Sequence, residues 1–86
     1  MVSDGNEPLL RPLIAQGLAT PENKGLFSEI LNLSINDGVV TIKSVTDYAL
    51  CAHGQVSRWR YGHSAPPKVS RVAIIEFILE SLNNKK

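Results

Sequence analysis

Residue types that could staple or anchor a small protein are scarce in this chain of 86 residues. Cys51 is the only cysteine, so no disulfide can form within the chain. A lone cysteine of this kind is typical of a small buried apolar residue in a reducing compartment. With one cysteine and two irregularly spaced histidines, a zinc site is not expected.

Long apolar runs are also missing. The most apolar window, VAIIEFILESL at 72–82, is too short to span a bilayer and contains two glutamates. The first residues, MVSDGNEPLLRPL, are polar and partly acidic where a signal peptide needs a basic and then an apolar segment. We therefore expect a soluble, cytoplasmic protein that does not contact a membrane.

Catalytic patterns are absent from the sequence as well. It contains no glycine-rich phosphate loop. Ser57 lies near His53, but no third group orients the two, and exposed serines and histidines are common. We therefore expect neither enzymatic activity nor a cofactor.

The composition is that of an ordinary globular protein, but the charge is unevenly distributed. Residues 1–40 hold two basic and five acidic residues, net −3, whereas residues 41–86 hold seven basic and three acidic residues, net +4. A local basic patch is typical of a protein that binds a phosphate backbone. The alternative is a solvated surface on which charges cluster by chance.

The length predicts one domain with a single core. Residues 1–19 are predicted to be a loose N-terminal segment with at most a short or irregular helix, because Pro12 and Gly17 weaken a helix-compatible pattern. Residues 20–84 are predicted to form the folded domain.

The first helix of that domain is expected to begin with Thr20 as N-cap and Pro21 in the first helical position. The triplet Asn-Asp-Gly at 36–38 is expected to end it. The next stretch, GVVTIKSVTDYALCAHG, is ambiguous, because its β-branched residues could also form a strand. Its apolar spacing, with Thr41 or Ser44 as a cap, favours a helix over about 43–50.

A short helix is expected over 53–61, and it combines apolar and cationic residues. On a helical wheel Val56 and Trp59 fall on one side, which must be buried. Arg58 projects outward and Arg60 sideways, because the two are 200° apart at 100° per residue.

The last helix, PKVSRVAIIEFILESLNN, is the strongest in the pattern. Val72, Ile75, Leu79 and Leu82 are expected to close the core, which leaves a second apolar group for a symmetric dimer: Ile74, Phe77 and Ile78. The alternative is that leucines and Ile14 of the N-terminal segment cover this surface within one chain.

The two short helices at 43–50 and 53–61 resemble the helix-turn-helix of lambda-repressor-like proteins, including the small Cro- and CII-like phage or bacterial regulators. The resemblance covers residues 42–62 closely and extends loosely to about 80. The family's recurrent apolar places correspond here to Val45, Ala49, Cys51, Val56 and Trp59. The run QVSRWRYGHSAPP, in which Gly62 closes the helix, is similar to the family's ending S-x-W-x-x-G-x-S-x-P.

Two places depart from the family pattern. Thr46 replaces a residue that is usually alanine, and Leu50 replaces the glycine of the turn. Because a leucine does not readily take a positive φ, we expect a turn of another shape or a register shifted by one residue.

The resemblance implies an all-α fold of four to five short helices that binds double-stranded DNA and regulates transcription. Carried over to this chain, the family's base contacts correspond to His53, Gly54, Ser57 and Arg58. Predicted phosphate contacts are Lys43, Ser44, Gln55, Arg60, Tyr61, His63 and Lys68. The rival hypothesis is a protein-interaction module, such as an adaptor or antitoxin-like partner, that keeps this fold and binds through Ile74 and Phe77.

Overall fold

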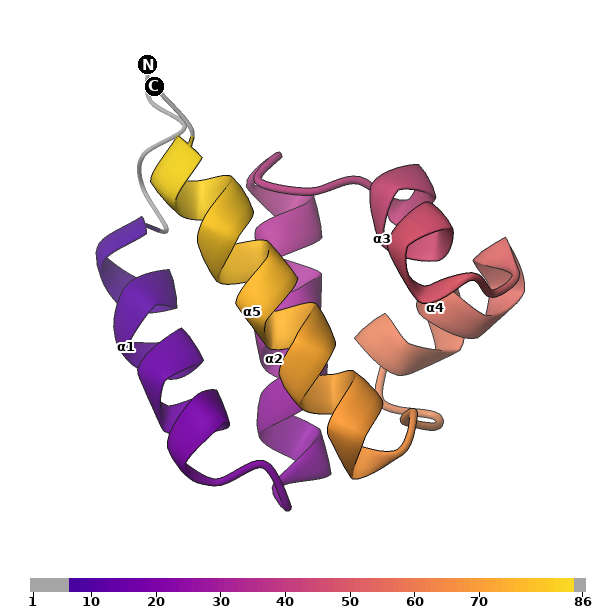
Figure 1. Ribbon diagram of the computed structural model, residues 1–86, viewed down its shortest axis with the longest axis horizontal. Helices are drawn as coiled ribbons and strands as arrows, with labels where there is room; N and C mark the ends of the chain where they lie inside the picture. Colours follow the sequence, from indigo (N-terminus) through magenta and orange to yellow (C-terminus); the bar gives the residue numbers. More distant parts are fainter. Residues whose placement is uncertain (1–6, 85–86) are drawn as a thin grey trace.

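The computed structural model describes residues 7–84, with side chains from Leu9 onward, as five α-helices (Figure 1). The helices are α1 (Glu7–Ala19), α2 (Lys24–Asn36), α3 (Ile42–Ala49), α4 (His53–Arg60) and α5 (Lys68–Asn84). No strand occurs within these residues, so the all-α prediction is confirmed for them and the strand alternative is wrong. Residues 1–6, which belong to the segment predicted to be loose, and residues 85–86 lie outside the described residues.

The helices pack around α5, which contacts α1, α2 and α3. In Figure 1, α1 and α3 lie on opposite sides of α5 and α2 passes behind it. Fourteen apolar residues from all five helices and the loop before α3 form one buried cluster. Within the described residues, no helix has the length and apolar character that a membrane span needs.

α1 is longer and more regular than expected. It runs for 13 residues with Pro12 inside it. Leu10 and Ile14 of this helix are buried, so its packing offsets the cost of an internal proline. The described part of the segment that was predicted to be loose therefore belongs to the core.

Gly17 is the reason α1 can lie close to its neighbours. A Cβ at Gly17 would stand 2.7 Å from Cδ1 of Ile30 and 3.1 Å from Cδ1 of Ile75. These residues belong to α2 and α5. The same glycine that weakens the helix pattern in the sequence thus allows three helices to meet.

α2 begins later than predicted. Asn23 is the N-cap, and its Oδ1 accepts a hydrogen bond from the Leu26 N–H at 3.0 Å. Thr20 instead donates its hydroxyl to the Gln16 carbonyl of α1 at 2.7 Å. The predicted end is confirmed, because α2 stops at Asn36 and Gly38 takes a φ of +78°.

The surface predicted for a dimer is not free. Ile74 and Ile78 are 1% and 0% exposed, and they lie in the core of a single chain. Phe77 is half-buried and stacks on the ring of Tyr48, with centroids 4.4 Å apart. The prediction failed because α5 packs against α1 as well as α2 and α3, and so buries more than one of its faces.

Candidate nucleic-acid interface

α3 begins with a reciprocal pair of hydrogen bonds. The Thr41 hydroxyl accepts from the Ser44 N–H at 3.0 Å, and the Ser44 hydroxyl accepts from the Thr41 N–H at 2.9 Å. The Ser44 hydroxyl also donates to the Thr41 carbonyl at 2.9 Å. This hydroxyl, which was predicted to contact phosphate, is therefore already used to hold the start of α3.

The turn between α3 and α4 has a left-handed residue at Leu50, with φ 56° and ψ 51°. The expectation that leucine would avoid a positive φ is wrong here. Both the Leu50 N–H and the Cys51 N–H donate to the Thr46 carbonyl, which closes the turn. The Leu50 side chain is 90% exposed, so packing contributes little to offset the strained backbone.

α4 is oriented as the helical wheel predicts. Val56 and Trp59 are buried, and Phe27 of α2 meets the Trp59 ring edge-to-face at 6.3 Å. The opposite side carries three of the predicted base contacts, Gly54, Ser57 and Arg58, and His53 lies on a flank. His53, Gly54 and Arg58 are exposed, and Ser57 is half-buried. Gly62, with φ +80°, follows the end of the helix as expected.

The basic side chains near α4 divide into two groups, those that are bonded to another side chain and those that have no partner in the described residues. In the first group, Lys43 pairs with Asp47 at 3.0 Å and Lys68 pairs with Glu22 at 3.2 Å. The pKa of Glu22 is lowered below its ordinary value, mainly by a hydrogen bond from the backbone of Glu22 itself and secondly by the Lys68 side chain. The second group has no hydrogen-bond or ion-pair partner within residues 7–84; its members are Lys24, His53, Arg58 and His63.

Arg60 belongs to the first group, although it was predicted to contact phosphate. Its Nε donates to Asn32 at 3.0 Å and its Nη2 donates to Asn36 at 2.7 Å. The guanidinium also lies 5.1 Å from the centre of the Tyr61 ring. Ser28 adds a 2.7 Å hydrogen bond from its hydroxyl to the Trp59 carbonyl. The carboxyl end of α4 is thus fastened to α2.

Arg71 is a positioning residue that the sequence argument missed. It is 6% exposed, and it donates from Nη1 to the Pro66 carbonyl at 2.8 Å and from Nε to the Pro21 carbonyl at 3.0 Å. These bonds tie the loop after α4 to the loop before α2. The available signal was its place three and four residues before Ile74 and Ile75, on the buried side of α5.

Gln55, another predicted phosphate contact, lies at an uncharged groove of about 420 Å³ between α3, α4 and α5. The groove is lined by Tyr48, Ala49, Cys51, Gln55, Trp59, Pro66, Pro67, Ser70, Ala73 and Ile74, none of which is charged. Cys51 is half-buried, and burial raises the pKa of its thiol. This groove therefore suits an apolar contact better than a phosphate.

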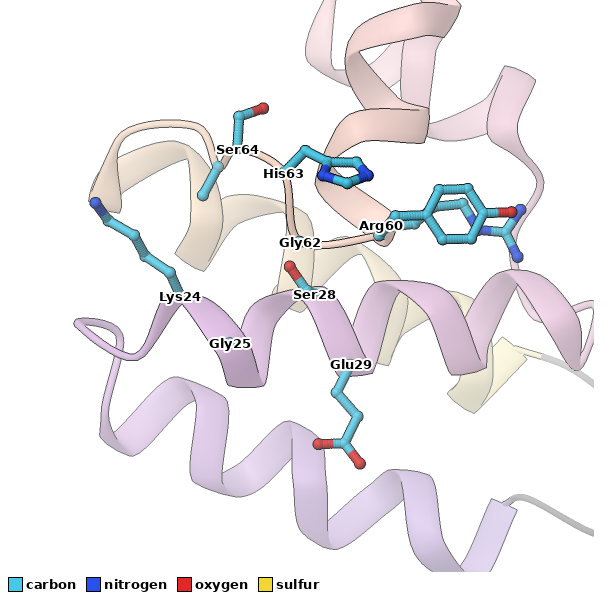
Figure 2. Close-up of a pocket in the computed structure, with 10 residues that line it drawn as sticks. Lys24, Gly25, Ser28, Glu29, Arg60, Gly62, His63 and Ser64 are labelled. Atoms are coloured by element: carbon cyan, nitrogen blue, oxygen red, sulfur yellow. The ribbon is translucent and has the colours of Figure 1, made fainter.

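A second groove, of about 570 Å³, lies between the start of α2 and the loop after α4 (Figure 2). Its lining includes charged and basic side chains, among them Lys24, Arg60 and His63. Lys24 was not among the predicted contacts, because the sequence places it about 30 residues before the helix that carries the other site residues.

No group of three or more histidine, cysteine, aspartate or glutamate side chains that could hold a metal ion occurs in the described part of the chain. Comparison with protein-family models, with curated proteins and with solved structures found no match to this sequence. The candidate interface therefore rests on its own geometry.

Proposed function

We propose that this chain binds double-stranded DNA in a sequence-specific way through a lambda-repressor-like helix-turn-helix formed by α3 and α4, and so regulates transcription. The observation that carries the proposal is the orientation of α4. Val56 and Trp59 anchor the helix, while Arg58 on the opposite side is exposed and has no partner within residues 7–84. An exposed arginine on a short anchored helix is free to enter a major groove.

The start of α4 supports the same proposal. Ala52 is the N-cap and offers no side-chain hydrogen bond, so the first N–H groups of the helix are not capped by a side chain. A Cβ at Gly54 would meet nothing within 4 Å, so packing within the chain does not require glycine there. A close approach of DNA to the backbone at Gly54 would explain why this position is a glycine.

In this proposal the contacts have separate roles. Arg58 donates two hydrogen bonds to the edge of a guanine, and His53 and Ser57 contact neighbouring base edges. Lys43 and Lys68 contact phosphates, because their present partners are highly exposed surface carboxylates and such ion pairs are weak. Arg60 contributes mainly by holding α4 in place.

The test is to select bound sequences from a random duplex pool and to measure affinity for the selected site over a range of salt concentrations. A DNA-binding protein loses affinity steeply as salt rises, because counterions are released on binding. We expect Arg58→Ala to weaken binding to the selected site by roughly 5- to 150-fold, which corresponds to about 1–3 kcal/mol, and to affect random DNA less. An equal loss on both DNAs would show that Arg58 contacts only phosphate.

A protein-interaction module remains the second candidate, and the exposed apolar side chains favour it. Leu50 and Val69 are 90% and 81% exposed. A partner would bind there and along the uncharged groove, since the originally proposed Ile74 is buried. Salt-independent or absent DNA binding, together with concentration-dependent association that Val69→Asp abolishes, would support this candidate over the first.

A further inference from the structure

The groove between α2 and the loop after α4 brings together residues far apart in the sequence. From α2 it takes Lys24, Gly25, Ser28 and Glu29, and from the other side it takes residues 60–65. Figure 2 shows this loop passing over α2, with Gly62 above Ser28 and Lys24 at the start of the helix. Gly62, with φ +80°, permits the loop to turn at this point.

The groove is suited to an anion. Lys24 and His63 have no hydrogen-bond or ion-pair partner within residues 7–84, and Arg60 adds a third basic group to the lining. Glu29 is the one acidic residue in the lining, and in Figure 2 its carboxylate points to the opposite side of α2 from the loop. An anion in the groove would therefore meet basic groups without a facing carboxylate.

Gly25 has no side chain that would keep an anion away from the backbone of α2. Packing within the chain does not require glycine at this position, because a Cβ there would meet only Asn23 Oδ1, at an ordinary contact distance of 3.5 Å. Gly25 also lies in the first turn of α2, where the backbone N–H groups make the helix end positive.

We propose that this groove binds a phosphate of the DNA backbone, with Lys24 as the principal charge and His63 and Ser64 as additional donors. This inference rests on the DNA-binding function proposed above. The groove starts at Arg60, the last residue of α4, so a strand that follows the carboxyl end of α4 would run into it. It is open to solvent rather than enclosed, which lets a phosphodiester enter while the strand continues on both sides.

The test compares Lys24→Gln with Arg11→Gln, which removes the same charge from α1, on the far side of α5 from α4 (Figure 1). Each phosphate contact contributes about 0.9 to the slope of log affinity against log salt on duplex DNA. We expect Lys24→Gln to lower that slope by about 0.9, on selected and random DNA alike. The ratio of the wild-type affinity to the Lys24→Gln affinity should therefore fall about threefold as the salt concentration rises fourfold. Arg11→Gln should leave the slope unchanged, and Lys24→Arg should restore it.

The outcomes separate this inference from the function on which it rests. If the wild type binds DNA with a steep salt dependence and Lys24→Gln leaves the slope unchanged, the phosphate site is wrong and the function stands. If the wild type does not bind DNA, both are wrong. A titration with inorganic phosphate alone tells whether the groove takes its phosphate from DNA or from solution. The amide NMR signals of Gly25 and His63 report the binding. Saturable shifts at low millimolar phosphate, together with an unchanged salt slope in Lys24→Gln, would contradict a site for DNA phosphate and point to free phosphate.

Discussion

The two sides of α4 carry similar polar groups but use them differently. On the side that faces α2, the Arg60 guanidinium is bonded to Asn32 and Asn36, and the Trp59 carbonyl accepts from Ser28. On the outer side, Arg58 is exposed and has no partner within residues 7–84. The two arginines are two residues apart, yet one fastens the helix and the other is free to bind.

This difference shows that a local excess of positive charge does not by itself identify binding residues. In the described part of the chain, every buried side-chain nitrogen or oxygen has a hydrogen-bond partner. The side-chain polar groups without a partner within residues 7–84 are therefore at the surface, and the basic ones among them are Lys24, His53, Arg58 and His63. Hydrogen bonds to other parts of the fold identify Arg60 and Arg71 as structural cations, whereas the exposed ion pairs of Lys43 and Lys68 are weak enough to leave both lysines as candidate contacts.

The largest effect on stability is expected from Arg71→Met, which removes the donors that hold both loops. The Pro21 and Pro66 carbonyls would lose charge-assisted hydrogen bonds in a buried setting. We expect the free energy of unfolding to fall by about 2–4 kcal/mol, as measured by urea denaturation. Arg58→Met is the matched control and should change it by less than about 0.5 kcal/mol. Equal effects of the two variants would contradict the distinction between structural cations and cations that are free to bind.

A smaller effect is expected from Arg60→Met. Losing its bonds to Asn32 and Asn36 should lower the free energy of unfolding by about 1 kcal/mol, because both amides can turn to water. In DNA binding the order should reverse, and Arg58→Met should lose more affinity for a selected site than Arg60→Met. Paired measurements of unfolding and DNA affinity on the two variants check this. A greater loss of DNA affinity in Arg60→Met would mean that the guanidinium leaves α2 to bind DNA.

The sequence predicts well those features that depend on local spacing. Val56 and Trp59 are three apart, and this alone fixes which side of α4 is buried and hence where Arg58 points. The end of α2 is predicted equally well, because glycine takes the left-handed conformation without the steric cost that a Cβ imposes, and Gly38 adopts it.

Features that depend on distant contacts are not predictable in this way. The apolar residues of α5 lie nearly all round the helix, so spacing cannot tell which of them meet α1, and Ile74 and Ile78 were assigned to a partner. In the same way, the helical wheel places Arg60 on a flank but does not reveal that its guanidinium bonds to Asn32 and Asn36 of α2. The start of α2 was misplaced because Thr20 and Asn23 are both competent caps.

The smallest effect is expected at Leu50, where the turn before α4 takes a left-handed backbone without glycine. Such a conformation costs an L-residue about 1–2 kcal/mol, and the exposed side chain contributes little packing to offset it. Leu50→Gly relieves the strain but enlarges the entropy of the unfolded chain by about 0.4–1 kcal/mol. A net gain of about 0.5–1 kcal/mol in urea denaturation is therefore expected, with DNA affinity unchanged because Leu50 is not among the proposed contacts. Should the variant lose stability only at protein concentrations where the wild type self-associates, the Leu50 side chain would belong to an interface between chains.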